Sequence, residues 1–335
     1  MIKIGIIGAG RMGNNHAKNL QLIQNTQLTA VYDIVPEKTA EFIQKYPGVR
    51  ACNSAAEVAE SPDVDLVLIT SPTYCHEEGV MAVMKTGKPI FCEKPLCRTR
   101  DQLARLAPLI RSYSNLFAIG FVRRYSPATM AFVEQLRNGR IGTPMCCSVN
   151  CTMGGFRREW GDWFADYEKC GGVTLDMLAH HCDLINMCLG KPETVYARAL
   201  MLNRNAEKPA DYLSATAMCP GGVICNLECS WLRSGPGDTY MTICGDKGTL
   251  KLSDRNGAEF FPVGGEPEKL SENEGLTGQI QEVISGGMYA IEMGMLIDCI
   301  TNGTKPRATA DNAIEAMEFC LGMLDSSETG KVITL

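Results

Sequence analysis

The residue of this chain best placed for chemistry is a lysine at the end of an apolar stretch. Glu93-Lys94-Pro95 follows the apolar residues 89–92 and lies downstream of a glycine-rich segment. A lysine in such a position can face a nicotinamide cofactor and donate a hydrogen bond to the oxygen of a substrate alcohol. The alternative is a solvated loop lysine. If Lys94 is catalytic, the sequence must also supply a cofactor site and a proton acceptor.

The glycine-rich segment, residues 8–13, fits the G-x-G-x-x-G pattern of a loop that binds a dinucleotide. In such a loop Gly8 permits the tight turn, Gly10 lets the backbone approach a pyrophosphate, and Gly13 allows close packing of helix on strand. The segment follows the first apolar strand and opens a helix, which is the context that the motif requires. A glycine-rich turn without a ligand is the alternative. We expect the cofactor to contact Gly8, Gly10, Arg11, Met12 and Gly13.

An acidic residue at the end of the next expected strand indicates which dinucleotide binds. Asp33 stands about twenty residues after Gly13, and its carboxylate can accept hydrogen bonds from the ribose hydroxyls of NAD. The same carboxylate would repel a 2′-phosphate, and neither Ile34 nor Val35 offers a cation to bind one. We therefore expect NAD rather than NADP. Asp33 can also cap the helix that follows, and the two roles are compatible.

A carboxylate and an imidazole are spaced to act together in the second half of the chain. Asp176 and His180 stand at i and i+4, which places them on one face if the segment is a single helix. Asp183 follows on the same side, and the preceding Gly171-Gly172 lets backbone approach closely. On spacing alone, a hydrogen-bonded helical pair is the simplest interpretation. A zinc site is the other, but no third ligand cluster accompanies the pair, so we expect no metal.

Composition excludes several classes of protein. The chain has 335 residues, enough for two domains with separate cores, and is 45% hydrophobic and 21% charged. Its net charge of −6, without a long basic run, argues against a nucleic acid or an acidic membrane as partner. No apolar run reaches transmembrane length, and a strand begins directly after Met1. We expect a cytoplasmic protein without a signal peptide.

The sixteen cysteines are scattered, often inside apolar runs, and no two of them have C-x-x-C spacing. A free cysteine behaves as a small buried hydrophobe, and a secreted disulfide scaffold would be much shorter. We therefore expect reduced thiols in the core.

Strands and helices alternate over the first 121 residues. Short apolar strands are expected at 2–7, 28–32, 64–69, 89–92 and 116–121. Helical patterns separate them at 11–24, 36–46, 75–86 and 99–113. Such alternation predicts an α/β domain of the Rossmann type, with a doubly wound parallel sheet.

The pattern changes after residue 121. A helix near 126–138 precedes longer strands at 145–152, 194–203, 211–219, 222–231 and 239–245, and helices return at 286–302 and 308–325. Gly221-Gly222 and the segment 245–248 suggest hairpin turns. We expect an NAD-binding domain at 1–121, and an α+β domain at 122–335 with a large, mostly antiparallel open sheet. The second domain would bind substrate and mediate oligomerisation.

These segments together resemble the glucose–fructose oxidoreductase / inositol dehydrogenase / MocA (Gfo/Idh/MocA) family nearly from end to end. Residues 69–76 resemble its T-P-x-x-x-H element, and residues 87–95 resemble its G-K-x-V-x-x-E-K-P element. Residues 171–183 resemble G-G-G-x-L-x-D-x-G-x-H-x-x-D. Residues 120–125 and 245–250 resemble a domain-crossing segment and a late hairpin. Val173 and Leu178 depart from the pattern by replacing glycines, and Leu178 adds bulk next to the expected site.

The resemblance implies a catalytic group of Lys94, Asp176 and His180. Oxidation of a secondary alcohol removes a proton from oxygen as hydride leaves carbon, and an imidazole can take that proton. Asp176 would orient the imidazole or bind a neighbouring hydroxyl, while Lys94 would stabilise the developing alkoxide. The family's Lys-Pro step is often cis, which Pro95 permits. Further cofactor contacts are expected from Thr70, Ser71, Pro72, His76, Glu93 and Lys94.

Substrate contacts are expected from Asp176, His180 and two further regions. Arg123 and Arg124 leave the last strand of the nucleotide domain, and we favour Arg124 as the ligand-binding residue. The loop 154–164 carries Trp160 and Trp163, whose faces can stack on the C–H side of a sugar ring. The alternative for this loop is a hydrophobic anchor on its own domain or on a second subunit.

The sequence therefore predicts an NAD-dependent oxidoreductase that acts on a secondary ring hydroxyl of a sugar, a glycoside or an inositol. One alternative is an enzyme that retains its NAD and processes glycosides, or transfers hydride between sugars, through a transient ketone. The other is a non-catalytic protein that senses NAD or sugar. The exposed face of the second sheet needs a partner, and the family resemblance suggests a homodimer or homotetramer.

Overall fold

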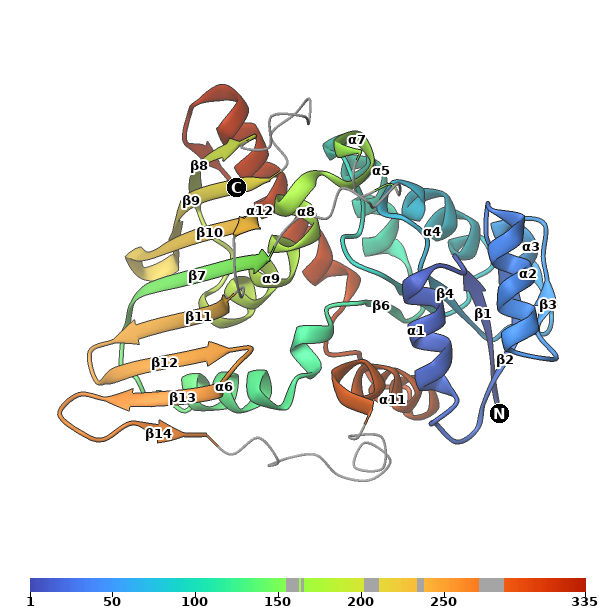
Figure 1. Ribbon diagram of the computed structural model, residues 1–335, viewed down its shortest axis with the longest axis horizontal. Coiled ribbons are helices and arrows are strands. Elements are labelled where there is room, and N and C mark those ends of the chain that lie inside the picture. Colours follow the sequence, from blue (N-terminus) through green and yellow to red (C-terminus); the bar gives the residue numbers. More distant parts are fainter. Residues whose placement is uncertain (155–162, 164–165, 202–210, 234–237, 271–285) are drawn as a thin grey trace. The chain divides into compact units, whose positions relative to one another are not determined.

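A computed structural model describes residues 1–335 except 155–162, 164–165, 202–210, 234–237 and 271–285 (Figure 1). The chain forms two compact units, and neither is one continuous stretch. The first unit comprises Met1–Tyr125 and Leu276–Ile314, and the second comprises Ser126–Gly275 and Glu315–Leu335. The first stretch thus ends four residues beyond the boundary expected at 121. The sequence placed 276–314 in the second domain, whereas in the structure this segment belongs to the first unit.

The first unit contains a sheet in which, over the described residues, six strands run parallel in the order β3-β2-β1-β4-β5-β6. The chain moves outward from β1 in both directions, and such a switch point opens a ligand crevice at the carboxyl ends of the strands. This is the doubly wound Rossmann sheet that the sequence predicts. Its strands are β1 (Ile2–Ile7), β2 (Thr26–Tyr32), β3 (Arg50–Ala51), β4 (Leu66–Ile69), β5 (Ile90–Cys92) and β6 (Phe117–Ile119).

Local sequence signals fix the ends of several helices in the first unit. Pro36 opens one helix, the Ser54 side chain caps another, and Thr99 forms a reciprocal capping box with Gln102. The helical segments are α1 (Arg11–Leu20), α2 (Pro36–Lys45), α3 (Ala55–Glu60), η1 (Thr73–Cys75), α4 (His76–Met84), α5 (Arg100–Ser112), η2 (Val122–Tyr125) and α11 (Gly287–Asn302).

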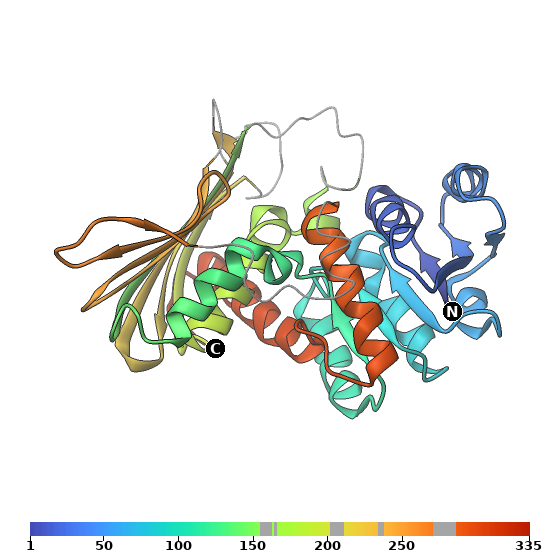
Figure 2. The ribbon, with the colours of Figure 1, turned by 90° about the horizontal axis from the view of Figure 1, so that it is seen from below.

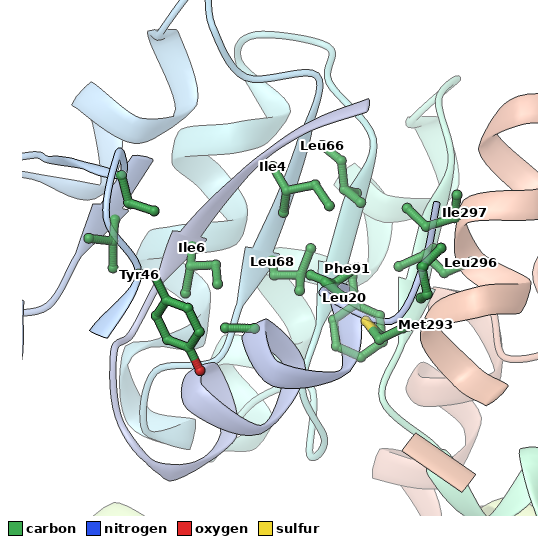
Figure 3. Packing of buried hydrophobic residues seen from close by; sticks show 14 of the residues in the cluster. Ile4, Ile6, Leu20, Tyr46, Leu66, Leu68, Phe91, Met293, Leu296 and Ile297 are labelled. Atoms are coloured by element: carbon green, nitrogen blue, oxygen red, sulfur yellow. The ribbon is translucent and has the colours of Figure 1, made fainter. Parts of the chain in front are cut away.

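A segment from late in the chain completes the core of the first unit. Helix α11 presents Met293, Leu296 and Ile297 at i, i+3 and i+4, a spacing that forms one apolar stripe. This stripe packs into the cluster formed by β1, β4, β5 and α1 (Figure 3). The labelled partners in that cluster are Ile4, Ile6, Leu20, Tyr46, Leu66, Leu68 and Phe91.

The second unit contains a sheet of nine strands over the described residues, in the order β14-β13-β12-β11-β7-β10-β9-β8-β15. The pairing of β7 with β10 is parallel, and the other pairings are antiparallel. The predicted mostly antiparallel sheet is confirmed. Its strands are β7 (Pro144–Gly154), β8 (Thr194–Leu200), β9 (Tyr212–Cys219), β10 (Val223–Arg233), β11 (Asp238–Gly245), β12 (Gly248–Ser253), β13 (Gly257–Pro262), β14 (Glu268–Lys269) and β15 (Ile333–Thr334).

Helices lie on one face of this sheet (Figure 2). Strand β9 shows the consequence: Leu213, Ala215 and Ala217 are buried, whereas the residues between them are more exposed. The helical segments that belong wholly to this unit are α6 (Pro127–Arg137), α7 (Tyr167–Cys170), α8 (Gly172–Asp176), α9 (Leu178–Leu189) and η4 (Pro220–Gly222). Helix α12 (Ala310–Thr329) begins in the first unit and continues into the second.

The sixteen cysteines are reduced thiols, and most are buried. Burial is the first cause that raises the pKa of Cys92, of Cys182 and of Cys229. This direction favours the protonated thiol at these three positions, where cysteine serves as a small core residue. Among the described residues, no helix is both long and apolar enough to cross a membrane.

Candidate active site

The three glycines of the loop between β1 and α1 meet different surroundings. Gly8 has a φ of +106°, and a Cβ there would lie 2.3 Å from the backbone nitrogen of Ser71. A Cβ on Gly13 would lie 2.1 Å from the carbonyl oxygen of Gly8. At Gly10 a Cβ would meet nothing within 4 Å. Gly8 and Gly13 thus allow close packing within the protein, and the space at Gly10 fits the approach of a pyrophosphate.

The N-terminus of α1 suits an anion. Gly10 is its N-cap residue and provides no side-chain cap, and no acidic residue lies in the first turn. The first backbone N–H groups of the helix and its dipole can therefore act on a phosphate. Arg11 is exposed and Met12 is partly exposed in that turn, so both lie where the sequence places cofactor contacts.

Asp33 follows β2 and is tied to the glycine loop. One carboxylate oxygen accepts a 2.8 Å hydrogen bond from the backbone N–H of Ala9, and the other accepts a 2.9 Å bond from the N–H of Val35. Each oxygen retains a second lone pair, which can accept from a ribose hydroxyl. Val35 is the N-cap residue of α2. Asp33 thus supports the start of this helix from two residues upstream, and a ribose-binding role remains open to it.

A pocket opens at the carboxyl ends of β1, β2 and β4, where the sheet reverses direction. Gly8, Asp33, Ser71 and Pro72 line it, as the sequence predicts for cofactor residues. Its walls also include Tyr32, Ala55, Cys75 and Glu78, which the sequence reasoning did not identify. Tyr32 could have been found, because it directly precedes Asp33 at the same strand end. The pocket fits the adenosine half of a dinucleotide.

Thr70 supports the loop from the end of β4. Its hydroxyl donates a 2.6 Å hydrogen bond to the carbonyl oxygen of Gly8, and its backbone N–H donates to Ile7. Thr70 is buried, and both of these hydrogen bonds hold the glycine loop. Ser71 lines the pocket, and its buried hydroxyl has no hydrogen-bond partner among the described residues.

His76 joins the segment after β4 to the segment that contains the lysine. Its Nδ1 lies 2.8 Å from the carbonyl oxygen of Pro95, and its Nε2 lies 2.8 Å from that of Ser71. Burial lowers the pKa of His76, although the two carbonyl groups oppose that shift. A neutral imidazole carries one N–H, so it donates to one carbonyl at a time. We expected His76 beside the cofactor, but its ring nitrogens contact the protein backbone.

Glu93 is buried, and its carboxylate contacts the backbone of Lys94. One carboxylate oxygen lies 2.7 Å from Nε2 of His16, and the other accepts a 3.1 Å hydrogen bond from the backbone N–H of Lys94. Lys94 is partly exposed, and the Lys94–Pro95 peptide bond is cis. Among the residues predicted to contact the cofactor, Glu93 thus supports the backbone of Lys94.

Asp176 and His180 lie on two consecutive helices. Helix α8 ends at Asp176 and α9 begins at Leu178, with Met177 (φ −99°, ψ −46°) between them. Met177 keeps a right-handed helical conformation, and its N–H donates to the carbonyl oxygen of Val173 at 3.0 Å, so the chain continues through the junction with nearly helical geometry. Both Asp176 and His180 are partly exposed, whereas Leu178 and His181 are buried. Of the two adjacent imidazoles, His180 is therefore the one open to a substrate of this unit.

The neighbouring His181 faces its own backbone. Its Nδ1 lies 3.4 Å from the carbonyl oxygen of Met177, four residues earlier. Leu178, which replaces a family glycine, is completely buried in the core of the unit. Among the described residues, no group of three or more His, Cys, Asp or Glu side chains could hold a metal ion.

The remaining residues predicted to bind substrate differ in burial and in contacts. Arg124 is buried, and its Nη1 donates a 2.6 Å hydrogen bond to the carbonyl oxygen of Arg307. This contact gives Arg124 a structural role within the first unit, whereas Arg123 is partly exposed. Trp163 is also partly exposed, and its carbonyl accepts from the N–H of Asp166. Trp160 lies outside the described residues.

Two family models match the chain. The model described as an oxidoreductase family with an NAD-binding Rossmann fold matches residues 2–121. The model of the GFO/IDH/MocA C-terminal domain matches residues 130–251. Together these matches span more than half of the 335 residues and both units.

Named relatives and solved structures are similar over large parts of the chain. Inositol 2-dehydrogenase of Acidothermus cellulolyticus is 29% identical over 258 residues, which cover 75% of this chain and 73% of the relative. Myo-inositol 2-dehydrogenase of Thermotoga maritima is 32% identical over 203 residues, which cover 60% and 59%. The WlbA dehydrogenase of Bordetella pertussis, solved with NADH and UDP-GlcNAcA, has a TM-score of 0.88 at 20% identity and coverage of 100% and 97%. At that identity, the structural match shows a shared fold.

Proposed function

Because the chain belongs to the Gfo/Idh/MocA family of oxidoreductases with an NAD-binding Rossmann fold, we propose that it oxidises a secondary hydroxyl of a ring polyol. Inositols are the substrates that we favour. The observation that carries this choice is the similarity to enzymes named inositol 2-dehydrogenase and myo-inositol 2-dehydrogenase. Free pyranoses and glycosides are the next substrates to consider.

The proposed reaction converts a ring C–H(OH) group into a ketone. NAD⁺, which the glycine loop and Asp33 would hold, would supply the acceptor for the hydride that leaves carbon with both electrons of the C–H bond. His180 takes the hydroxyl proton, because an imidazole titrates near neutral pH and this one is partly exposed. Lys94 donates a hydrogen bond to the reacting oxygen and stabilises its developing negative charge. Asp176 orients the imidazole or accepts from a neighbouring hydroxyl.

NAD is the cofactor, and we propose that Asp33 selects it over NADP. The carboxylate is held in place by two backbone N–H groups, so its negative charge would face a 2′-phosphate. Ile34, the next residue, is 68% exposed and supplies no compensating cation. The choice can be tested by comparing the dissociation constants of NADH and NADPH. Tighter binding of NADPH would contradict the role of Asp33.

A substrate panel tests the activity. The purified protein is mixed with NAD⁺ and inositols, free pyranoses or glycosides, and formation of NADH is followed by absorbance. Turnover of an inositol with the highest kcat/KM supports the proposal, and turnover confined to pyranoses or glycosides contradicts the choice of substrate. If protein that binds NADH turns over none of these compounds, the proposed activity is wrong.

Two variants test the catalytic group within that assay. We expect His180→Ala and Lys94→Ala each to lower kcat by about 100-fold or more, in the range of lost acid–base or electrostatic catalysis. Lys85→Ala is the matched control, because Lys85 is exposed near the end of α4. Rates near wild type in both active-site variants would contradict the assigned roles.

We further propose that the open face of the second sheet joins subunits into a dimer or tetramer. Four large apolar side chains from β8, β9 and β10 are exposed between 37% and 47%: Tyr196, Leu200, Met218 and Ile224. Covering such side chains would stabilise an assembly. Light scattering after size-exclusion chromatography measures the mass. We expect Met218→Lys with Ile224→Lys to reduce it to that of a monomer, whereas a monomeric wild-type protein would contradict the proposal.

A further inference from the structure

Three ionisable side chains are buried together behind the proposed catalytic lysine. His16 lies on α1, Glu93 follows β5, and Glu292 lies on α11, so segments far apart in the sequence supply them. Their exposed fractions are 0%, 6% and 0%, respectively. Burying ionisable groups is costly unless they are paired or neutral. We call these three residues the buried acid cluster.

Glu93 connects this cluster to the lysine. Its carboxylate contacts Nε2 of His16 at 2.7 Å and the backbone N–H of Lys94 at 3.1 Å. Gly120 leaves room for it, since a Cβ there would lie 2.9 Å from the carboxylate. The carboxylate is thus held in a narrow space with one oxygen on the histidine and the other on the lysine backbone. A displacement of the Glu93 carboxylate would therefore also disturb the backbone of Lys94.

Glu292 adds a second carboxyl group to the cluster. Neither of its side-chain oxygens has a hydrogen-bond partner among the described residues. Burial first, and then the negative charge of Glu93, raises the pKa of Glu292 well above its ordinary value. This shift favours the uncharged acid over the carboxylate. An uncharged Glu292 avoids placing a second buried carboxylate near Glu93, where the two would repel each other.

Further ionisable groups near the cluster come from α1, η2 and α11. Tyr289 lies one turn before Glu292 on α11, and its ring contacts the ring of His16 at a centroid distance of 5.9 Å. Burial, together with both glutamates, raises the pKa of Tyr289 to about 12. Arg11 on α1 and Arg123 on η2 act on Tyr289. Tyr125 on η2 interacts with Glu292, and Tyr125 is in turn close to Arg124 and to Cys299 on α11.

We propose that Glu292 and His16 are positioning residues for the dehydrogenase reaction: within the buried acid cluster they hold Glu93 and, through its carboxylate, the backbone of Lys94. The kinetic part of this proposal rests on the proposed function. If Glu292 ionises, two buried carboxylates repel each other and Glu93 moves away from the backbone N–H of Lys94. A shift of that kind at a catalytic group lowers the rate more than it weakens substrate binding.

The pH profiles of two Glu292 variants test the proposal. Glu292→Gln keeps the shape of the neutral acid and cannot ionise, so we expect near wild-type kcat at pH 7 and a fall in activity that begins at a higher pH than in wild type. Glu292→Leu removes the polar group, and we expect kcat to fall by about tenfold with a smaller change in KM. Asp298→Asn, at a partly exposed position on the same helix, is the matched control.

His16 provides an independent arm. His16→Gln retains an N–H that can donate to Glu93, whereas His16→Leu does not. We expect the glutamine variant to keep most of the activity and the leucine variant to lose about tenfold in kcat. One result would contradict the proposal: all four variants keep the wild-type kcat and pH profile, and at each position the Gln and Leu variants lose the same thermal stability. The two residues would then have a structural role only.

Binding of NADH separates this proposal from the proposed function. The dissociation constant is measured by NADH fluorescence over the same pH series, and it requires no substrate. A wild-type protein that binds NADH but turns over no polyol contradicts the proposed function alone. In that case we expect binding to weaken at alkaline pH in wild type and to stay flatter in Glu292→Gln. Identical pH dependence in the two proteins would overturn the role of the cluster.

Discussion

The carboxylate of Asp33 accepts a 2.8 Å hydrogen bond from the backbone N–H of Ala9, in the middle of the glycine loop. The residue predicted to bind ribose thus also fixes the loop predicted to bind pyrophosphate. Because one side chain serves both purposes, its removal affects the cofactor in two ways. The ribose loses an acceptor, and the loop loses a restraint.

The first prediction concerns this aspartate. Asp33→Ala should raise the dissociation constant of NADH by about tenfold or more, as expected when a charged hydrogen bond of about 1.5–3 kcal/mol is lost. It should weaken NADPH binding less, because the repulsion of the 2′-phosphate disappears as well. Glu37→Gln, at an exposed position in the first turn of α2, is the control. An unchanged preference between the two cofactors would contradict the prediction.

The second prediction separates two glycines of the same loop. A Cβ on Gly13 would meet the carbonyl oxygen of Gly8 at 2.1 Å, whereas a Cβ on Gly10 would meet nothing within 4 Å. Gly13→Ala should therefore lower the free energy of unfolding by about 1–3 kcal/mol through overpacking. Gly10→Ala should leave the melting temperature nearly unchanged and weaken NADH binding, because the methyl group occupies space needed by the pyrophosphate. Calorimetry and fluorescence titration measure the two effects, and equal losses of stability would contradict the distinction.

The N-terminal sheet could be predicted because its signals are local. Parallel strands buried on both faces are short apolar runs, and the glycine loop marks the turn between the first strand and helix. The short strand β3 and the later strands β12, β13, β14 and β15 were not predicted individually. Strands as short as β3, β14 and β15, at two residues each, carry too little pattern to detect.

Long-range relationships could not be predicted. The helical pattern at 286–302 indicates an apolar stripe, but a stripe does not say which sheet it covers, so α11 was placed with the wrong unit. The contact between His16 and Glu93 joins residues 77 positions apart and has no local signal. The junction of α8 and α9 at Met177 also has no local signal, because no proline or glycine marks it.

The third prediction concerns His76 and acid stability. Burial lowers the pKa of His76 in the folded protein, so below its unfolded value of about 6.5 the unfolded chain binds more protons. Stability should therefore fall as the pH drops below about 6.5. In His76→Gln, which retains an amide donor for the carbonyl of Pro95 or Ser71, this part of the fall should be absent. Thermal melts between pH 7.5 and 5 measure it, and parallel curves for the two proteins would contradict the assignment.

The last prediction concerns Glu292 and alkaline stability, with the opposite sign. Burial and the charge of Glu93 raise its pKa in the folded protein, so above the ordinary glutamate value the folded chain binds more protons than the unfolded chain. Its contribution to stability is thus present at low pH and is lost as the pH rises, until Glu292 ionises in the folded protein as well. A glutamine at position 292 cannot ionise, so the stability of Glu292→Gln should not fall with pH for this reason. Its melting temperature should match wild type near pH 5 and exceed it by about 2–4 °C or more near pH 8.

The control for this comparison is Asp298→Asn, an acid-to-amide change at a partly exposed position of the same helix. Because no comparable burial acts on that position, its melting temperature should follow wild type across the pH range. A gap between Glu292→Gln and wild type that is constant with pH would indicate better packing rather than removal of a buried ionisable group. A gap that narrows as the pH rises would contradict the raised pKa of Glu292 in the buried acid cluster.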